Sequence, residues 1–415
     1  MNLEQYDVIL IGAGLVGASL VVALQNQGLK VAVLETHLPD VTANPKKDTR
    51  PLSLSYSSSM ILQTLNIWPE LEKFACPIKS VHVSDAGALG AIHFSAREQH
   101  VSALGYVVPF GDLQHALYQR AAEQPNVDFI AITQLMAIRC EETGATVTVN
   151  AANGEREITA SLVVAADGTH STSRDLLKIP TERSDRGDVA LAAEIYLNGE
   201  HEYAAFERFT REGTLALLPL FNRHRCRLVW SMHKDMARDV AQWGDEKFKE
   251  YIENSFAGRI PAIEKINRGG QFPLQTIIAK EQIRPGFVLL GNAAHTLYPV
   301  AAQGFNLGLR DVAVLAETLV NARSQLESIG DLSVLQAYVE WRVSDQERVA
   351  GLTDSISHLF GLQIPLLKPA RGLGLLATDL ILPIKKRLAK PLMGLGGRLP
   401  KLARGIGLGS HVNTN

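Results

Sequence analysis

The sequence has few cysteines, and none of them are closely spaced. Only Cys76, Cys140 and Cys226 occur in 415 residues, and no two of them form a C-x-x-C pair. An odd number of widely separated cysteines argues against a disulfide framework. We therefore interpret the three thiols as small buried side chains in a protein of the reducing cytoplasm.

Long apolar runs and an excess of charge are also missing. No window reaches about 18 uninterrupted apolar residues, and no basic stretch precedes an apolar core at the N-terminus, so we expect neither a membrane span nor a signal peptide. The 41 basic and 43 acidic side chains give a formal net charge of -2, which provides no general attraction to nucleic acid. Length and composition are typical of a folded protein with more than one domain-sized unit.

Several catalytic motifs are absent as well. The chain has no G-x-S-x-G elbow, no P-loop and no H-E-x-x-H pair, and its histidines lack the close spacing of metal ligands. We therefore expect no metal site. His170 and His295 lie inside glycine-rich motifs, and we interpret them as residues that shape loops.

The N-terminal residues have the pattern of a βαβ unit. An apolar run over residues 8–11 predicts a buried strand, and Gly12-Ala13-Gly14-Leu15-Val16-Gly17 then matches G-x-G-x-x-G. Helical spacing continues to Gln27, and the pattern after it predicts a second strand that ends before Glu35. This combination predicts a dinucleotide site but does not distinguish NAD from FAD.

Each conserved feature of such a unit has a physical task. Gly12 makes the tight turn, Gly14 lets the backbone approach a pyrophosphate, and Gly17 lets the helix pack closely on the strand. The helix N-terminus offers free N–H groups to the phosphates. Glu35 is expected to accept hydrogen bonds from the adenosine ribose.

Two later motifs also bear on a cofactor site. An apolar strand over residues 161–166 leads into Asp167-Gly168, at the strand end where cofactor crevices of α/β sheets lie. An ordinary turn remains the alternative, because Asp-Gly is a common turn pair. The third motif, over residues 291–311, reads GNAAHTLYPVAAQGFNLGLRD. Its lack of large side chains indicates that something must approach the backbone closely.

These motifs, in this order, resemble those of the class A flavoprotein aromatic hydroxylases over most of the chain. Further segments resemble the branch that hydroxylates polyprenylphenols in ubiquinone biosynthesis, namely residues 48–68, 105–108, 205–210 and 215–220. The resemblance implies an α/β fold, with a Rossmann-like FAD-binding domain of the para-hydroxybenzoate hydroxylase type, a β-rich substrate domain and C-terminal helices. The expected boundaries are 1–72, 100–180 and 275–335 for the FAD-binding domain, 73–99 and 181–274 for the substrate domain, and 336–415 for a basic, amphipathic helical region.

The resemblance also implies roles for single residues. Asn292 would bind a ribityl hydroxyl of FAD, although the wider family has Asp there, and Pro299 and Gly304 would form the catalytic loop beside the flavin. Asn306 would begin a helix that points its positive end at the flavin. Arg50 would hold cofactor phosphates or the nicotinamide nucleotide, or would be an ordinary solvated loop residue. No acid or base side chain is assigned.

The implied reaction is the hydroxylation of a phenol such as 2-polyprenyl-6-methoxyphenol. NAD(P)H reduces FAD, dioxygen forms a C4a-hydroperoxyflavin, and its distal oxygen passes to the ring. No second nicotinamide domain is expected, because the G-x-G-x-x-A match at residues 372–377 follows no strand. A flavin reductase or dehydrogenase that acts on a lipid, and a non-catalytic lipid-binding member of a quinone-biosynthesis assembly, remain alternatives.

The C-terminal region is strongly basic. Residues 364–405 hold nine lysines and arginines and a single acid, Asp379, among repeated leucines. A basic amphipathic helix can lie on an anionic membrane, so we expect Lys385, Lys386, Arg387 and Lys390 to form a cluster facing the inner surface of the membrane. A helical cap with a solvated basic face is the alternative.

Overall fold

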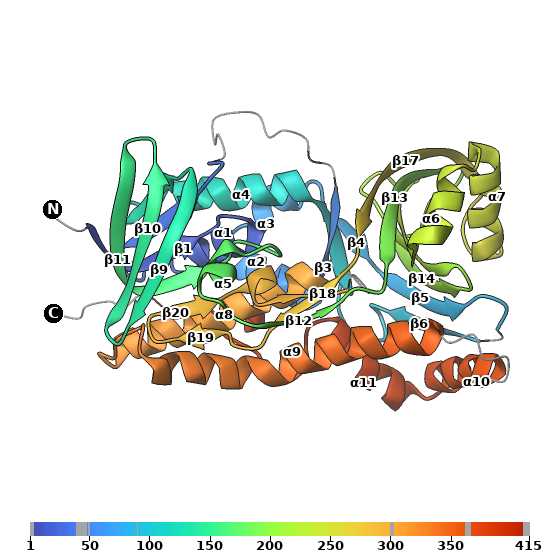
Figure 1. Cartoon of the computed structure of the whole chain (residues 1–415). Coiled ribbons are helices and arrows are strands. Elements are labelled where there is room, and N and C mark those ends of the chain that lie inside the picture. The colour runs from blue at the N-terminus through green and yellow to red at the C-terminus, as the bar shows by residue number, and fades with distance from the viewer. Residues whose placement is uncertain are drawn as a thin grey trace.

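The computed structural model describes residues 4–38, 48, 50–88, 90–298, 303–361 and 367–409, and no side chains of Gln303 or of residues 352–371. Two large sheets lie at opposite ends of an elongated molecule, and a long helix, α9 (Leu332–Gly361), extends from one end toward the other (Figure 1). The expected architecture, an FAD-binding fold with a β-rich part and C-terminal helices, is confirmed.

The first sheet has eight strands and contains the βαβ unit. Strand β1 (Glu4–Ile11) pairs in parallel with β2 (Val31–Glu35) and with β11 (Gly154–Ala165). The order along the sheet is β19 (Ile283–Arg284), β20 (Phe287–Leu289), β11, β1, β2 and β8 (Val127–Ala131), and β10 (Gly144–Ala151) and β9 (Gln134–Glu141) extend from β11. The apolar runs at the ends of β1 and β11 and along β2 follow from this arrangement, because central parallel strands are buried on both faces.

Helices cover one face of this sheet. The main core lies between the sheet and α1 (Leu15–Ala23), α4 (Phe110–Ala122) and α8 (Gln303–Ser324), and α8 packs in turn on α9. The apolar residues Leu307, Val312, Leu315 and Leu319 of α8 are all fully buried. Helix α1 ends earlier than the predicted Gln27, because Asn26 adopts a left-handed conformation with a φ of 61°.

The second sheet has seven strands, and its strands come from two separate parts of the sequence. Their order is β17 (Ile263–Pro273), β13 (Asp188–Leu197), β16 (Arg225–His233), β15 (Gly213–Pro219), β14 (Ala204–Thr210), β5 (Ser80–Asp85) and β6 (Ala91–Ser95). Helices α6 (Lys234–Ala241) and α7 (Asp245–Phe256) pack on one face, around Trp230, Phe248 and Phe256. The segments 73–99 and 181–274 thus contribute to one sheet, while their exact limits as a domain stay a prediction.

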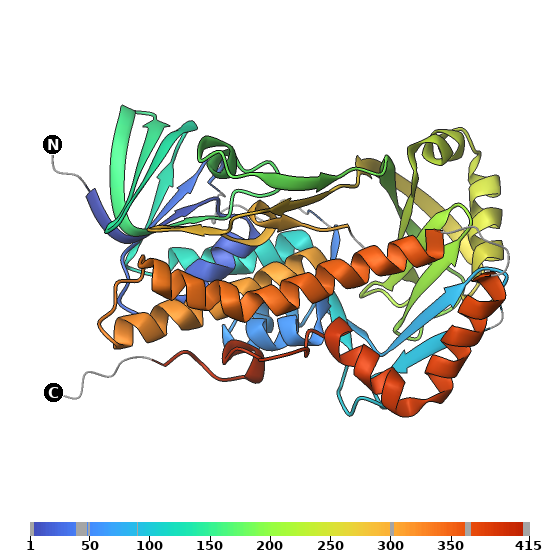
Figure 2. The ribbon, with the colours of Figure 1, turned by 60° about the horizontal axis from the view of Figure 1, so that its bottom comes forward.

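Two three-stranded sheets lie between the large ones. One consists of β3 (Pro51–Ser55), β7 (Gly105–Pro109) and β4 (Cys76–Ile78), and the other of β12 (Thr181–Ser184), β18 (Thr276–Ala279) and β21 (His295–Thr296). Helices α2 (Tyr56–Thr64) and α3 (Trp68–Leu71) follow β3, and α5 (Thr172–Leu176) follows β11 (Figure 2). The connections through these small sheets join the two halves of the molecule at several points.

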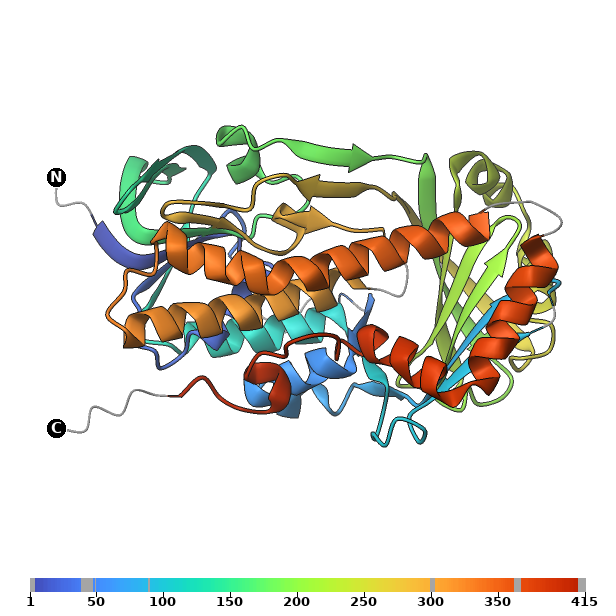
Figure 3. The same ribbon diagram turned by 90° about the horizontal axis from the view of Figure 1, so that it is seen from below.

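The C-terminal region forms α10 (Leu367–Leu380) and α11 (Leu382–Leu392), which pack against β5 and β6 (Figure 3). The G-x-G-x-x-A match lies inside α10, so it forms no strand–turn–helix nucleotide site. In the part of the chain that the structure describes, no helix is long and apolar enough to cross a bilayer.

The prediction for Lys385 is wrong. Its side chain is buried on the inner side of α11, and its ammonium lies 3.0 Å from a carboxylate oxygen of Asp379 and 3.0 Å from one of Glu98. Lys385 therefore joins α11 to α10 and to the segment after β6. Its burial depends on Glu98, which is 287 residues away in the sequence.

We predict that Gly17→Ala destabilises the protein and that Gly14→Ala does not. A Cβ on Gly17 would overlap the carbonyl oxygen of Gly12, whereas a Cβ on Gly14 would meet no atom within 4 Å. Forcing atoms into a packed interior costs about 1–3 kcal/mol. Urea unfolding of both variants checks the difference, and equal stabilities would contradict the close helix–strand packing at Gly17.

Candidate functional site

The G-x-G-x-x-G loop lies where β1 ends and α1 begins. Gly12 has a φ of +90°, and a Cβ there would lie 2.7 Å from the carbonyl oxygen of Ala166. This close approach brings the first loop against the Asp-Gly turn that follows β11. Open space lies beside Gly14, at the N-terminus of α1, where free N–H groups can receive a phosphate. The loop thus has the shape that a pyrophosphate requires.

Glu35 stands at the end of β2 beside this loop. One oxygen of its carboxylate accepts a hydrogen bond from the Ala13 N–H at 2.8 Å, and the other accepts hydrogen bonds from the N–H groups of Thr36 (2.7 Å) and His37 (3.1 Å). Burial alone would raise the pKa of Glu35, but these hydrogen bonds outweigh it and leave the pKa below its ordinary value. The carboxylate is therefore ionised and held at the edge of the nucleotide loop.

Asp167 and Gly168 form the turn that the sequence indicated at the end of β11. The Asp167 carboxylate accepts hydrogen bonds from the Ser171 hydroxyl at 2.6 Å and the Ser173 N–H at 2.9 Å, so it caps the start of α5. Gly168 has a φ of +82° and open space beside it. The turn interpretation and the cofactor interpretation are compatible, because the carboxylate shapes the loop whose backbone faces the first motif.

Arg174 ties this turn to the third motif. Its guanidinium is buried and donates to the carbonyl oxygens of Thr169 at 2.9 Å and Ala293 at 3.0 Å. The Thr169 hydroxyl also accepts hydrogen bonds from the Thr296 hydroxyl (3.1 Å) and the Asn292 amide (3.5 Å). Asn292 is otherwise exposed. The second and third motifs therefore meet at one edge of the sheet.

The bare backbone of the third motif has two different neighbours. Gly291 and Gly308 face Val16 of the first loop, and a Cβ would lie 3.0 Å and 2.9 Å from its methyl groups. A Cβ on Gly304, in contrast, would meet no atom within 4 Å among the residues that the structure describes. The prediction that a ligand explains the small residues throughout this stretch is therefore wrong for Gly291 and Gly308, which are small because α1 packs against them.

The remaining predicted site residues have distinct surroundings. Asn306 is buried, and its side chain accepts from the Ser55 N–H (2.8 Å) and donates to the Ser53 carbonyl (2.9 Å), so it fixes the start of α8 to β3. Arg50 is largely exposed, pairs with Asp48 and lies 4.7 Å from the centre of the Phe110 ring. The Arg50 guanidinium lowers the pKa of the Asp48 carboxylate. Pro299 lies outside the described residues.

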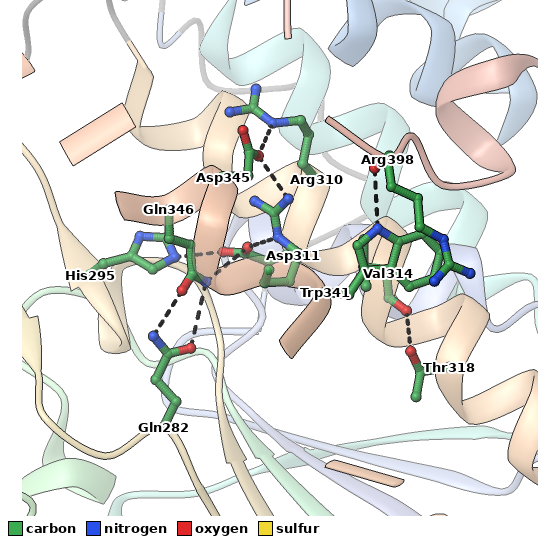
Figure 4. Close-up of polar contacts among 11 residues, drawn as sticks. Gln282, His295, Arg310, Asp311, Val314, Thr318, Trp341, Asp345, Gln346 and Arg398 are labelled. Atoms are coloured by element: carbon green, nitrogen blue, oxygen red, sulfur yellow. Dashed lines mark hydrogen bonds and ion pairs between the residues drawn. The ribbon is translucent and has the colours of Figure 1, made fainter. Parts of the chain in front are cut away.

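Sequence reasoning missed a buried network of charges behind the third motif (Figure 4). The Asp311 carboxylate on α8 lies 2.6 Å from a ring nitrogen of His295 and 2.6 Å from the Arg342 guanidinium on α9. Asp345 bridges Arg342 at 2.7 Å and Arg310 at 2.8 Å. The signal was the charged pair Arg310-Asp311 within an apolar stretch of α8, but its partners lie far away in the sequence.

The network holds Asp311 ionised. Burial opposes ionisation, but Arg342 and then His295 outweigh it and lower the pKa of Asp311 to about 2. Because His295 lies on β21, directly after the Gly291–Ala293 turn, this carboxylate connects the loop of the third motif with both long helices. The network positions the site and is not itself part of the cofactor surface.

Comparison with known proteins agrees with this geometry. The sequence profile of the family described as FAD binding domain matches residues 5–350. The chain belongs to this family. It is 30% identical to the ubiquinone hydroxylase UbiL of Rhodospirillum rubrum, over 97% of this chain and 93% of that protein. It is 28% identical to the 3-demethoxyubiquinol 3-hydroxylase of Escherichia coli, over 95% of this chain and all of that protein.

Solved structures agree in fold. The p-nitrophenol 4-monooxygenase PnpA of Pseudomonas putida superimposes with a TM-score of 0.75 at 16% identity, over 95% of this chain and all of that chain. PqsL of Pseudomonas aeruginosa superimposes with a TM-score of 0.72 at 20% identity, over 89% of this chain and all of that chain. Because the chain belongs to this family and its relatives are hydroxylases, it is an FAD-dependent hydroxylase.

We predict that Asp311→Asn lowers the free energy of unfolding at pH 7 by about 3–5 kcal/mol, because it leaves Arg342 buried beside a neutral amide. A carboxylate with a lowered pKa stabilises the fold above its unfolded pKa of ~3.9 and loses that contribution as the pH falls toward 2. The difference between the two proteins should therefore shrink over this range. Urea unfolding at pH 7 and at pH 3 measures it.

The exposed ion pair between Arg139 on β9 and Glu157 on β11 provides a control. Glu157→Gln should cost less than about 1 kcal/mol, because exposed ion pairs contribute little. A loss for Asp311→Asn as small as the loss for Glu157→Gln would show that the buried network does not stabilise the fold.

Proposed function

We propose that this protein hydroxylates the aromatic ring of a polyprenylphenol, such as 2-polyprenyl-6-methoxyphenol, in ubiquinone biosynthesis. NAD(P)H and dioxygen are the co-substrates. The observation that carries the proposal is near full-length similarity to relatives named for ubiquinone hydroxylation, joined to a nucleotide loop with open space beside Gly14. FAD supplies the oxygen-transfer chemistry when bound. The protein binds and orients FAD and the substrate, and it excludes water from the site.

In this proposal the first motif holds the ADP half of FAD. The glycines Gly12, Gly14 and Gly17 form the loop at the N-terminus of α1, and N–H groups there contact the pyrophosphate. Glu35 accepts hydrogen bonds from the adenosine ribose. Its carboxylate oxygens have lone pairs beyond those used by the backbone, so it can hold the loop and the ribose together.

The second and third motifs hold the flavin half. Asp167 and Gly168 shape the turn that faces the first loop, and Asn292 offers an exposed amide to the ribityl chain. Gly304 leaves room for the ring at the start of α8, while the Asn306 side chain fixes that helix start and leaves cofactor contact to its backbone. Pro299 would lie beside the reactive face. Arg50 is exposed enough to meet the phosphates of FAD or of NAD(P)H.

The division into parts follows the same proposal. Residues 1–72, 100–180 and 275–335 bind FAD, and residues 73–99 and 181–274 bind the substrate. The region 336–415 packs against both of these parts. Helix α9 packs on α8, while α10 and α11 pack on β5 and β6.

Turnover of a short-chain 2-prenyl-6-methoxyphenol tests this function. Protein loaded with FAD should consume NADH or NADPH and dioxygen in proportion to a hydroxylated product detected by mass spectrometry. Gly14→Val should purify without FAD and show no turnover, because the branched side chain would occupy the pyrophosphate space. Consumption of NAD(P)H without hydroxylated product would instead indicate a reductase or dehydrogenase. A colourless wild type that refuses FAD would indicate a non-catalytic lipid-binding protein.

We further propose that α10 and α11 contact an anionic membrane surface. Five apolar residues are exposed where the helices meet and along α11, which are Leu380, Ile381, Leu382, Ile384 and Leu388. Leu380 alone is 73% exposed. Such a contiguous apolar surface is typical of an interaction site.

The charges around this surface favour an anionic lipid partner. Arg387 and Lys390 are exposed on α11 and Lys386 is half-buried, whereas Asp379 is neutralised by Lys385. A second copy of the chain would bring cations face to face across such a surface, whereas anionic headgroups attract them. Contact at this end would place the seven-stranded sheet close to the membrane, where a polyprenyl substrate resides.

Replacing Lys386, Arg387 and Lys390 together by Gln should weaken binding to phosphatidylglycerol vesicles roughly 100-fold, since each cation contributes about 1 kcal/mol. Co-sedimentation at low and moderate salt measures the change. The matched control replaces Lys234, Lys247 and Lys249 on α6 and α7, which removes the same charge from another surface. If both triple variants bind the vesicles as the wild type does, α10 and α11 only cap the fold.

A further inference from the structure

The seven-stranded sheet has two unlike faces. One face packs against α6 and α7 around a core that includes Trp230, Phe248 and Phe256. On the other face, a row of half-buried residues crosses five adjacent strands, and cross-strand pairing joins them in the order Ala192, Val229, Ala216, Glu207 and Val83. Glu207 is the only ionisable residue in that row. Its neighbours are small or apolar, so the sheet surface around the carboxyl is shallow enough to receive a flat ligand.

This second face is turned toward the FAD-binding part of the molecule. Ala205 lies two residues before Glu207 on β14, so the two side chains point to the same side. Ala205 packs against Cys76 and Ile78 of β4 and Val107 of β7. Strand β7 pairs with β3, whose backbone is bound by Asn306 at the start of α8. Glu207 therefore projects into the region between the substrate sheet and the proposed flavin site.

The Glu207 carboxyl has no hydrogen-bond or ion-pair partner among the residues that the structure describes. The Glu207 side chain is half-buried on this face, so its carboxyl is close to protein atoms and still open to an approaching ligand. Desolvation by the surrounding protein raises the pKa of Glu207 to about 7. An unpaired carboxyl in such surroundings is costly, and such groups occur mostly at functional sites.

Charged groups on the same face are farther along the strands. Asp85 lies on β5 opposite Phe209, and Arg227 lies on β16 opposite Leu218, next to Glu194 on β13. Glu194 is engaged by Arg225, and Asp379 and Lys385 on the adjacent helices pair with each other. None of these groups contributes to the altered acidity of Glu207, whose only cause is burial.

We propose that Glu207 is the catalytic base that accepts the proton of the substrate's phenolic hydroxyl. This role rests on the proposed function. The O–H bond of the phenol breaks, an O–H bond forms on the carboxylate, and the electron pair left on the phenolate oxygen raises electron density on the ring. The activated ring carbon takes one oxygen atom of dioxygen, and the other leaves as water with two electrons from NAD(P)H. The ring carbon then loses its hydrogen as a proton, and Glu207 returns its proton to the product hydroxyl.

The acidity of Glu207 suits this step. A free phenol has a pKa near ~10 and an ordinary glutamate one near ~4.3, so an ordinary carboxylate would be a weak base for it. A carboxyl that titrates near pH 7 is a stronger base and is still ionised in a large fraction of molecules at physiological pH. Ala216 lies directly opposite Glu207 and Val229 lies one strand farther on, and these short apolar side chains leave space for the ring and its apolar substituent.

The test compares wild type with Glu207→Gln, which keeps the size of the side chain and removes the base. We expect kcat to fall roughly 100- to 10,000-fold, with FAD content and melting temperature unchanged. In the wild type, kcat/KM should rise with pH through about 7 as Glu207 loses its proton. In the variant this rise should vanish, and activity should recover only as the pH approaches ~10, where the phenol ionises by itself.

Two further variants separate a catalytic from a structural role. Glu207→Asp keeps a carboxylate and should retain a rise near pH 7 with reduced kcat. Glu264→Gln, an exposed glutamate on β17 of the same sheet, should leave the pH profile unchanged. Wild-type turnover and pH profile in Glu207→Gln would overturn the role of Glu207 while leaving the proposed function intact. Lack of phenol hydroxylation by the wild type would overturn both.

Discussion

The ionised carboxylate of Asp311 is the interaction on which the arrangement of the site depends. It is fully buried, so it is tolerated only because Arg342 and His295 bind its two oxygens. Those partners lie on α9 and β21, and Asp311 itself lies on α8. One carboxylate therefore sets the position of the two long helices and of the loop after the Gly291–Ala293 turn. A purely apolar contact would permit these elements to slide, whereas paired charges accept only one geometry.

The three glycine-containing motifs are held together by contacts with each other, in addition to the contacts that they would make with a ligand. Val16 of the first loop fits between Gly291 and Gly308, and Gly12 lies against the backbone of Ala166 and Asp167. Arg174 then joins the second motif to the third. A nucleotide bound at Gly14 and a flavin beside Gly304 would thus meet a preorganised surface, which lowers the entropic cost of holding an extended cofactor.

The two faces of the seven-stranded sheet differ in their packing and composition. Alternation along each strand places large apolar side chains such as Trp230 under α6 and α7, where they form a core. On the opposite face, the row of residues that crosses the centre of the sheet is small or apolar except for Glu207. The C-terminal helices cover the edge of this sheet at β5 and β6, so the apolar surface of α10 and α11 lies near the same layer. In the proposed function, flavin and phenol would then meet on the face that carries Glu207, and the membrane would lie beside the edge formed by β5 and β6.

The sequence by itself determined the nucleotide loop, the family and the fold class. Glycines at Gly12, Gly14 and Gly17 and the apolar runs around them act through near neighbours, so their meaning can be read locally. Strand and helix periodicity in the βαβ unit likewise depends on adjacent residues, and its elements were predicted correctly apart from the end of α1. The branch of the family was also recognisable, because its motifs extend over most of the chain.

Only the tertiary structure decided which side chains are free and which are engaged. Lys385 belongs to a basic stretch, yet its side chain is buried and forms ion pairs with Glu98 and Asp379. Gly291 and Gly308 resemble a ligand cradle, yet Val16 fills the space beside them. Asp311 is a fully buried acid that meets an arginine, whereas Glu207 is half-buried and has no hydrogen-bond or ion-pair partner among the residues that the structure describes. These outcomes depend on contacts between residues far apart in the chain, which no local pattern encodes.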